Sequence, residues 1–435
     1  MIDSWKSITA EATCITGSQQ MSQMPPAALR LIPGSATQAH FRRSVEMLWM
    51  ALVVLCLSCG ADSRSMQVVV NTAEDLDTTL EYALQNHVNC YEVGAKCTLR
   101  AAFDLIGPVV SASDDLVIIL PADVAGPSGV FTLVRVSNFS LPSLGGPLPS
   151  ALYTKAGFGN LTIRGIASSS GVYPALAVNV SGADVKIMYI GDSTATLNAC
   201  VTVEGVTFLG SHSTGGGMMV TGLFYAEVKN CSFMSNLNCD NSHDTGSGGG
   251  LDIRTRRALV HTSYFFNNSA GWGGGLYLSV TEGAVIFDST FEANSGNGCY
   301  GTHGLSGSAL QFSAPMLVMT RCTFVNNSNA YTTAVQTSVY ILWGVRGRQV
   351  IEKCRFASES DTMYSDGQMI IRDVTFASNK YGTVLGTVLN CSAPKSPCNA
   401  SFDCDATPDS SWSCDVAAHF RSQDPEPQHP LGSGN

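Results

Sequence analysis

The sequence predicts an all-β protein built as a right-handed parallel β-helix solenoid with a short N-terminal capping helix. Three observations lead to this prediction. A short motif recurs across residues 195–380, no helical pattern separates its copies, and charged residues make up only 13% of the 435 residues whereas 45% are hydrophobic. This composition argues against disorder along the whole chain and suits a β-rich extracellular protein.

The recurring motif is a β-branched run, a few polar residues, a small residue, Ser or Thr, and then Phe, often with Asn three residues later. A second element, Gly-Gly-Leu, recurs at 249–251 and 274–276. A unit this small cannot bury its own apolar face, whereas stacked units can, so we expect each strand to pair with its equivalent in the next coil. The motif ends at Phe208, Phe233, Phe265, Phe291, Phe324, Phe356 and Phe376.

The parity of the motif predicts a corner inside it. Val228 and Phe233 are five residues apart, so both face the interior only if the chain turns near Asn230, a residue type that tolerates the left-handed conformation. Cys322 and Cys354 would then be neighbours, either as buried free thiols or as a disulfide. They belong to an expected inward stack of small side chains two positions before each Phe, formed by Val206, Cys231, Ser263, Ser289, Cys322, Cys354 and Val374.

A signal peptide is expected near the N-terminus. Basic residues at 41–44 precede an apolar run at 47–57 and small residues at 58–61. Because about 40 residues come first, we expect the true start at Met47 or at an upstream exon junction. The apolar run is too short to span a bilayer, and no other run is longer. The expected segments are 1–61 (extension and signal peptide), 62–135 (cap and first strands), 136–385 (β-helix) and 386–435 (Cys-rich segment and polar tail).

Cysteine and sequon usage points to secretion. Twelve of the 15 Cys residues follow the predicted signal peptide, an even number that fits a disulfide framework. Near the C-terminus we expect disulfides among Cys391, Cys398, Cys404 and Cys414, because the paired short spacings of zinc sites are absent there. Candidate N-glycosylation sequons begin at Asn138, Asn160, Asn179, Asn230, Asn267, Asn326, Asn390 and Asn399.

The charge of the chain limits its partners. The net charge is −10 and no basic run is present, so nucleic acid is not expected as a partner. An acidic polysaccharide would need a basic groove or bound Ca²⁺. Beyond that possible Ca²⁺, we expect no cofactor and no metal site.

The Phe-x-x-Asn and Gly-Gly-x-Leu/Ile elements resemble the repeats of polymorphic outer-membrane proteins, which belong to the pectin-lyase-like right-handed β-helix superfamily. The resemblance covers roughly residues 195–380 and implies a stacked parallel β-helix. The alternating C-terminal strands of that family are not apparent, so autotransport is not expected.

A second resemblance lies upstream. Residues 97–103 are similar to the Cys-Ser/Thr-Leu-Arg-x-Ala motif that opens many β-helix domains. Thr98 can cap a short helix that covers the open first coil, since a solenoid must hide its exposed strand edges. We expect Cys90 and Cys97 to pair across the preceding loop. The apolar side of the helix would consist of Leu99, Ala102, Phe103 and Ile106.

Catalytic chemistry is not evident. Enzymes of this fold resemble polygalacturonases or pectate lyases, whose charged motifs are missing, and Gly301-Thr-His-Gly304 breaks the expected Gly-His-Gly spacing. The strongest local candidate for ligand binding is the loop with Asp240, His243 and Asp244, whose carboxylates and imidazole suit metal ligation or acid–base work. It is followed by Asp252, and an accidental polar loop is the simpler interpretation.

Neighbouring side chains could contribute to such a site. Arg254 and Arg256 could hold an anionic sugar, although alternating charges on an exposed strand explain them as well. Tyr264, Trp272 and Tyr277 offer stacking surfaces for sugar rings or pack within the fold. We therefore expect a secreted or cell-surface structural or adhesive module that presents a glycosylated face to glycans or proteins. The alternative is a polysaccharide lyase or glycoside hydrolase.

Overall fold

The computed structural model confirms the predicted parallel β-helix. All of the described residues belong to the compact unit that begins at Ser65. Nearly all described strand pairs are parallel, and the exception is a small hairpin of β4 (Ser140–Leu141) and β5 (Gly146–Pro147). The structure describes residues 65–76, 90, 95–103, 115–135, 140–141, 146–147, 150–154, 159–179, 185–191, 197–210, 216–238, 246–296, 307–328, 337–341, 348–357, 361–377 and 384–392.

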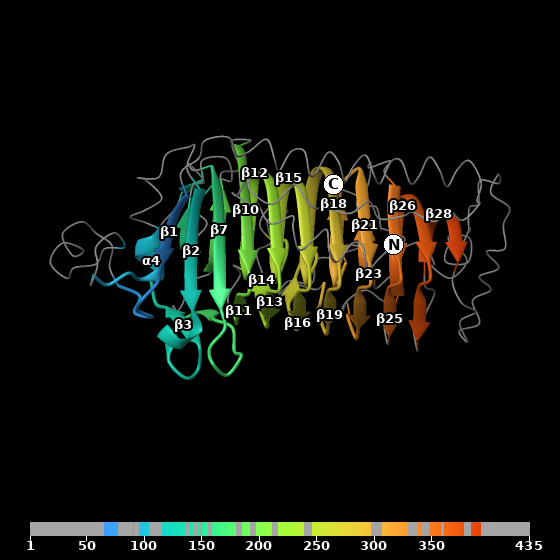
Figure 1. Ribbon diagram of the computed structural model, residues 1–435. Coiled ribbons are helices and arrows are strands. Elements are labelled where there is room, and N and C mark those ends of the chain that lie inside the picture. The colour runs from blue at the N-terminus through green and yellow to red at the C-terminus, as the bar shows by residue number, and fades with distance from the viewer. Residues whose placement is uncertain are drawn as a thin grey trace, which may run out of the picture. The chain divides into compact units, whose positions relative to one another are not determined.

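Fifteen strands form one large parallel sheet, which we call the long sheet (Figure 1). Its last strand, β28, runs to Ser392 and so extends past residue 385, where the sequence placed the end of the β-helix. The strands are β1 (Ser65–Val69), β2 (Asp115–Pro121), β6 (Ser150–Thr154), β7 (Asn160–Ile166), β9 (Lys186–Gly191), β10 (Leu197–Glu204), β12 (Met218–Lys229), β15 (Leu251–His261), β18 (Leu276–Phe287), β20 (Leu310–Ser313), β21 (Met316–Thr320), β23 (Thr337–Ile341), β24 (Arg348–Glu352), β26 (Asp361–Arg372) and β28 (Val384–Ser392).

Nine shorter strands form a second parallel sheet, which we call the Phe sheet, and in sequence they alternate with strands of the long sheet. A two-stranded piece, β14 (Leu237–Asn238) with β17 (Ser269–Ala270), lies between the two sheets along the chain. The Phe sheet consists of β3 (Val130–Leu133), β8 (Ala175–Val178), β11 (Thr207–Leu209), β13 (Ser232–Met234), β16 (Tyr264–Phe266), β19 (Thr290–Glu292), β22 (Thr323–Val325), β25 (Arg355–Ala357) and β27 (Thr375–Ala377).

Each of the longest strands has two halves. In β15 the pairing with β18 shifts register between Thr255 and Arg257, and β12 shifts at the equivalent place, between Thr221 and Leu223. Farther along, β20 pairs with the first half of β18 and β21 with its second half. The long sheet therefore presents two outer faces, one for each half of its strands.

Two left-handed corners flank the strands of the Phe sheet, and the first is the corner that the sequence predicted near Asn230. In a typical coil the corners lie three residues before and two residues after the Phe, as at Asn230 (φ 52°) and Ser235 (φ 55°) around Phe233. The left-handed backbone conformation at such corners is unfavourable for most residues, so Gly and short polar residues are preferred there. The two corners allow the chain to turn from the long sheet into a three-residue strand of the Phe sheet and then out of it again.

The Phe side chains form a continuous buried ladder between the corners. Consecutive rings from Phe208 to Phe356 are stacked with centroids 4.6–5.0 Å apart. The predicted inward stack two positions earlier is also confirmed, since all of its residues are buried. Within that stack Cys322 and Cys354 are free thiols, and the amide N–H of Cys322 lies 3.5 Å from the Cys354 sulfur. Burial, together with the neighbouring Cys354, raises the pKa of the Cys322 thiol.

The Asn three residues after each Phe forms a second buried ladder. Asn294 donates from Nδ2 to the carbonyl oxygen of Phe265 (2.9 Å) and to Oδ1 of Asn327 (2.9 Å). Its own Oδ1 accepts from the backbone N–H and from Nδ2 of Asn268 (3.1 and 3.0 Å). Each side chain thus satisfies backbone groups that the corner would otherwise leave unpaired inside the protein. The ladder comprises Asn236, Asn268, Asn294 and Asn327.

The Gly-Gly element allows the coils to approach closely. A Cβ atom added at Gly249 would lie 2.5 Å from the carbonyl oxygens of Gly274 and Ser269, closer than real Cβ contacts allow. Gly248, just before it, has φ +65°. Gly is therefore required at this corner both for its conformation and for lack of space.

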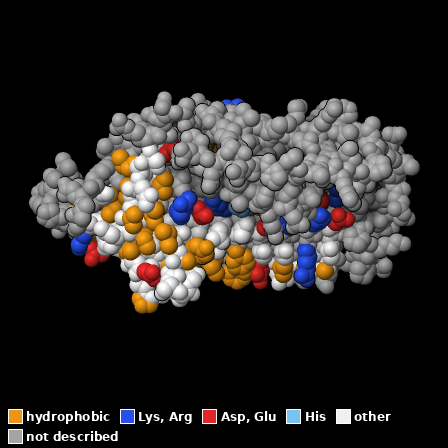
Figure 2. Space-filling view, viewed as in Figure 1, with side chains coloured by type: hydrophobic (Ala, Val, Ile, Leu, Met, Phe, Trp, Pro, Cys, Tyr) orange, Lys and Arg blue, Asp and Glu red, His pale blue; other side chains and the backbone are white. Residues whose placement is uncertain are grey.

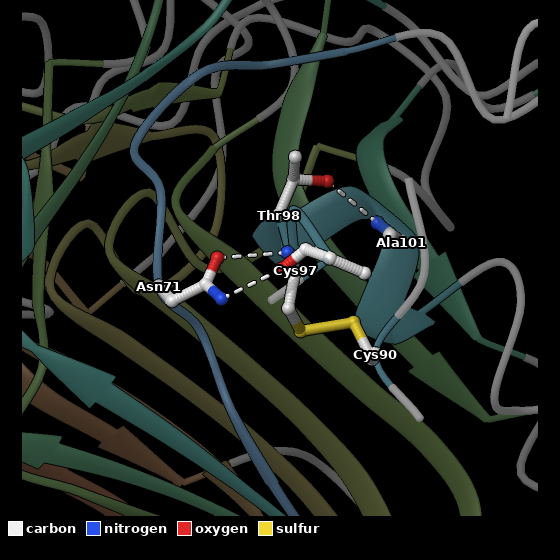
Figure 3. Close-up of a disulfide and its surroundings, with 6 residues drawn as sticks. Asn71, Cys90, Cys97, Thr98 and Ala101 are labelled. Carbon is white, nitrogen blue, oxygen red and sulfur yellow. Dashed lines mark hydrogen bonds between the residues drawn. A yellow bond between two sulfur atoms is a disulfide. The ribbon is translucent and has the colours of Figure 1, made fainter. Parts of the chain in front are cut away.

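A three-residue helix, α4 (Leu99–Ala101), lies at the N-terminal end of the coils, where the sequence predicted a cap. Thr98 Oγ1 accepts from the N–H of Ala101 at 2.9 Å, and Cys97 is joined to Cys90 by a disulfide, the pair that the sequence singled out (Figure 3). Asn71, which follows β1, holds this segment in place. Its Oδ1 accepts from the N–H of Cys97, and its Nδ2 donates to the carbonyl oxygen of Ala95. Ile106, predicted to join the apolar side, lies outside the described residues.

A buried ion pair fixes the cap to several coils. The Arg100 guanidinium binds both carboxylate oxygens of Asp75 (2.6 and 3.0 Å) and donates to the carbonyl oxygens of Ala151 and Arg135. Asp75 also accepts from the backbone N–H groups of Val134 and Arg135. A buried ion pair is tolerated only when its remaining hydrogen-bonding groups are satisfied, as they are here.

The Asn ladder predicts a large penalty for losing one member. Asn294→Ala takes one hydrogen bond from the Phe265 carbonyl oxygen and leaves the buried backbone N–H of Asn268 without the Asn294 oxygen, so we expect a loss of about 3 kcal/mol in the free energy of unfolding. Denaturant titration followed by circular dichroism measures the shift. Asn267→Gly, at the adjacent exposed corner, should change stability by only a few tenths of a kcal/mol. Equal midpoints for the two variants would contradict the ladder's role.

Candidate functional site

The first half of the long sheet carries a row of aromatic and polar side chains on its outer side, which we call the outward row. Backbone register aligns these residues across consecutive strands. Leu251 and Ile253, the neighbours of Asp252 along β15, lie in the core, so alternation turns the row to the other side of the sheet. Within the row Tyr189, Met219, Asp252 and Gln311 are buried, whereas Tyr153 and Tyr277 are partly exposed. The outward row consists of Tyr153, Tyr189, Met219, Asp252, Tyr277 and Gln311.

Asp252 and Arg254 form a charged pair in the row. The Arg254 guanidinium donates from Nε and Nη2 to the two carboxylate oxygens of Asp252 (3.1 and 3.0 Å). Burial raises the pKa of the Asp252 carboxyl above its ordinary value, although Arg254 and Lys186 both favour the ionised form. Arg254 also lies over the Tyr277 ring, 5.4 Å from its centroid, a cation–π contact.

Gln311 offers an amide that no protein group satisfies. Its side chain is fully buried, and neither Nε2 nor Oε1 has a hydrogen-bond partner. Buried polar groups are normally paired, so an unpaired amide is a place where a bound water or a ligand hydroxyl gains a hydrogen bond. In register, Gln311 lies next to Tyr277.

A second cluster lies at the bend between the two strand halves. Arg256 and Arg257 both bind the carboxylate of Glu282, and both guanidinium groups lie over the Phe224 ring at 5.0 and 5.5 Å. Although partial burial opposes ionisation, the hydrogen bonds from the two arginines hold the pKa of Glu282 below its usual value. The two positive charges therefore share one negative partner within the protein.

The second half of the long sheet carries a cluster of charged side chains on its outer side. Glu204 pairs with Arg164 (3.1 Å) and Lys229 (3.5 Å), and Glu227 lies 3.2 Å from the His261 ring. Figure 2 shows hydrophobic side chains gathered over β1, β2 and β7, and charged side chains over the strands that follow. Among the described residues, the exposed large hydrophobic side chains are those of Val69, Val134, Ile166, Val172 and Tyr173.

The structure brings some of the predicted ligand-binding residues together. Arg254 contacts Asp252 in the outward row, whereas Arg256 contacts Glu282 at the bend. The loop residues predicted beside them, Asp240, His243 and Asp244, lie outside the described residues, so that part of the candidate site stays a prediction. Of the proposed stacking residues, Tyr277 belongs to the outward row. Tyr264 lies in the Phe sheet, and its hydroxyl donates to Glu292 at 2.6 Å.

Several other predicted residues lie outside the described part of the chain. These are Asn138, Asn399, Cys398, Cys404 and Cys414. Asn390 and Cys391 lie in β28, where the structure gives the backbone course only. The C-terminal disulfides therefore remain predictions.

The sequence did not predict four of the six residues of the outward row, namely Tyr153, Tyr189, Met219 and Gln311. Tyr153 and Tyr189 come from β6 and β9, which precede the Phe repeat and carry no copy of it. Gln311 lies in β20, and only the register with Tyr277 reveals its place in the row. Alternation within the short apolar segments at 150–154 and 186–191 was the available signal.

The described residues contain neither a metal-binding cluster nor a membrane-spanning helix. No three His, Cys, Asp or Glu side chains in the described ranges are arranged to hold a metal ion. Within the same part of the chain, no helix is both long and apolar enough to cross a bilayer.

Comparison with known proteins gives a partial similarity. A stretch of 191 residues is 28% identical to part of the metabotropic glutamate receptor-like protein R of Dictyostelium discoideum. This stretch is 42% of the present chain but covers only 11% of that protein's length. No family model and no solved structure matches the chain.

The raised pKa of Asp252 predicts a pH effect on stability. Because the folded carboxyl holds its proton to higher pH than the unfolded one, the native state binds more protons between the two pKa values. Stability should therefore fall as pH rises from about 4 through the folded pKa and then level off. Asp252→Asn should remove this dependence of stability on pH. Denaturant midpoints of both proteins from pH 4 to 8 measure it, and parallel profiles would contradict the shift.

Proposed function

We propose that this chain is a structural or adhesive β-helix module, secreted or held at the cell surface, that presents a rigid face to glycans or proteins. The observation that carries the proposal is the outward row. Its residues come from strands held in register, so their spacing along the coils, about 4.8 Å per strand, is fixed by backbone hydrogen bonds. A preorganised row loses little conformational entropy when it binds a repetitive ligand.

The chemistry of the row suits a sugar chain. Tyr rings stack on the apolar faces of sugars, while a carboxylate, a guanidinium and an amide bond the hydroxyl groups. Both amide atoms of Gln311 are unpaired but buried, so the partly exposed Tyr153 and Tyr277 are the members of the row that a sugar chain would contact first. Neutral glycans fit better than acidic ones. Arg254 already pairs with Asp252, the two arginines at the bend share Glu282, and the whole chain carries a net charge of −10.

We also propose that the repeats are of the polymorphic outer-membrane protein type within the pectin-lyase-like superfamily. The Phe ladder, the Asn ladder and the close approach at Gly249 give each residue of the two motifs a physical role. The similar stretch in a receptor-like protein supports a place at the cell surface.

One observation favours a second function, polysaccharide cleavage. A buried carboxyl with a raised pKa is a common feature of general acids, and burial raises the pKa of Asp252. In this alternative Asp252 would protonate the leaving sugar oxygen. Glycan cleavage that depends on Asp252 would therefore replace the adhesive proposal.

Binding tests distinguish these functions. The secreted chain is incubated with immobilised neutral and acidic polysaccharides, and both retention and newly formed chain ends are measured. We expect retention by a neutral polymer without new ends. Tyr277→Ala should weaken retention about tenfold, because it removes a stacking surface worth roughly 1.4 kcal/mol.

The matched control is Tyr264→Ala, which removes a tyrosine from the outside of the Phe sheet and should leave retention unchanged. If both Tyr variants are retained like the parent chain, the outward row is not the binding face. New chain ends that disappear in Asp252→Asn would identify an enzyme.

A further inference from the structure

Three of the sequon asparagines lie at the left-handed corners that flank the Phe sheet. Asn230 is at the first corner of its coil, while Asn267 and Asn326 are at the second corner of theirs, with φ of 52°, 52° and 55°. All three side chains are exposed. The corner conformation is therefore compatible with a large group on each side-chain nitrogen.

Contacts of these side chains leave them accessible. Asn267 donates from Nδ2 to the Ser235 hydroxyl at 3.2 Å, an exposed bond that water replaces easily. In each of these three sequons, the residue between the acceptor Asn and the Ser belongs to the repeated motif. Asn268 and Asn327 are members of the buried ladder. The exposed acceptors Asn267 and Asn326 directly precede them in the chain.

The sequon at Asn160 has a different environment. Asn160 begins β7 inside the long sheet, between β2 and β10. Its Nδ2 donates to Asp115 Oδ1 at 2.8 Å and its Oδ1 accepts from the N–H of Cys200 at 3.3 Å. Both polar atoms of the Asn160 side chain are therefore engaged in hydrogen bonds across strands, and the side chain is only partly exposed.

An apolar stripe runs along the outside of the Phe sheet beside the second corners. Phe266 directly precedes Asn267, and Val325 directly precedes Asn326. Alternation turns both side chains away from the core, and both are partly exposed. The stripe consists of Leu209, Met234, Phe266 and Val325, interrupted by Glu292. Contiguous exposed apolar surface promotes association of proteins.

We infer that Asn230, Asn267 and Asn326 carry N-linked glycans, and that the glycans on the last two cover this apolar stripe. The inference rests on the extracellular placement in the proposed function. The donor is an oligosaccharide linked to a lipid through diphosphate. The amide nitrogen forms a bond to the sugar C1, the bond from C1 to the diphosphate oxygen breaks, and the amide proton leaves to a base of the transferase.

The position of these glycans has a consequence for binding. The corners adjoin the Phe sheet, whereas the outward row belongs to the first half of the long sheet. Modification at the corners therefore hydrates the Phe-sheet side and places no glycan on the outward row. Asn160 remains unmodified in the folded protein.

Site occupancy tests the inference. The full chain, fused to a heterologous cleavable signal sequence, is translated with microsomes, which supply the transferase and donor. Enzymatic release of the glycans in ¹⁸O water followed by peptide mass spectrometry marks each modified Asn. We expect the label at Asn230, Asn267 and Asn326 and not at Asn160.

Matched variants separate the sequon from the corner. Ser232→Ala, Ser269→Ala and Ser328→Ala should each remove one glycan, whereas Ser269→Thr should keep its glycan. If the chain is protected inside the vesicles and the three corner asparagines are unlabelled, the site assignment is wrong. The site assignment is also wrong if, in folded protein that resists protease, Asn160 is labelled to the same extent as the three corner asparagines.

Association of the folded protein tests the covering of the stripe. Enzymatic deglycosylation should shift the chain from monomer to larger species on size-exclusion chromatography, and Phe266→Ser with Val325→Ser should reverse the shift. If the deglycosylated chain stays monomeric at the same protein concentrations, the glycans do not act by covering the apolar stripe. Polysaccharide retention is measured on the same deglycosylated double variant, so loss of adhesion and loss of modification are observed separately.

Discussion

The buried Asn ladder is the interaction on which the coil geometry depends. At the second corner the chain leaves the Phe sheet, and several of its backbone groups turn toward the interior. Asn268 and Asn294 each bind a Phe carbonyl oxygen of the preceding coil while hydrogen bonding the equivalent Asn in the next coil. A side chain that bonds the coils on both sides of it fixes the register of the strands around it, including strands that carry the outward row.

The first coil cannot use this device, because no equivalent coil precedes it. The N-terminal cap provides other means. Arg100 and Asp75 join segments far apart in sequence through a buried ion pair whose spare donors and acceptors are all satisfied. Asn71 and the Cys90–Cys97 disulfide fix the short helix beside them. A rigid start of this kind keeps the later coils in register.

Sequence alone predicted the features that repeat. The spacing of Phe, the corner at Asn230 and the small inward residues all follow from alternation and from the need to bury one apolar face. The outward row was not predicted as a whole, because its first members lie in β6 and β9, outside the repeat. Pairing between Asp252 and Arg254 also required the structure, since the sequence shows two charges but not whether they neutralise each other.

A distance between two spin-labelled amino acids placed at Thr207 and Thr375 tests the stacked coils most directly. Both residues are on the outer side of the Phe sheet, six in-register steps apart. Stacking predicts a narrow distribution near about 29 Å, from about 4.8 Å per step. An unstacked chain of this length would give a broad distribution near roughly 70 Å, and that result would contradict the account.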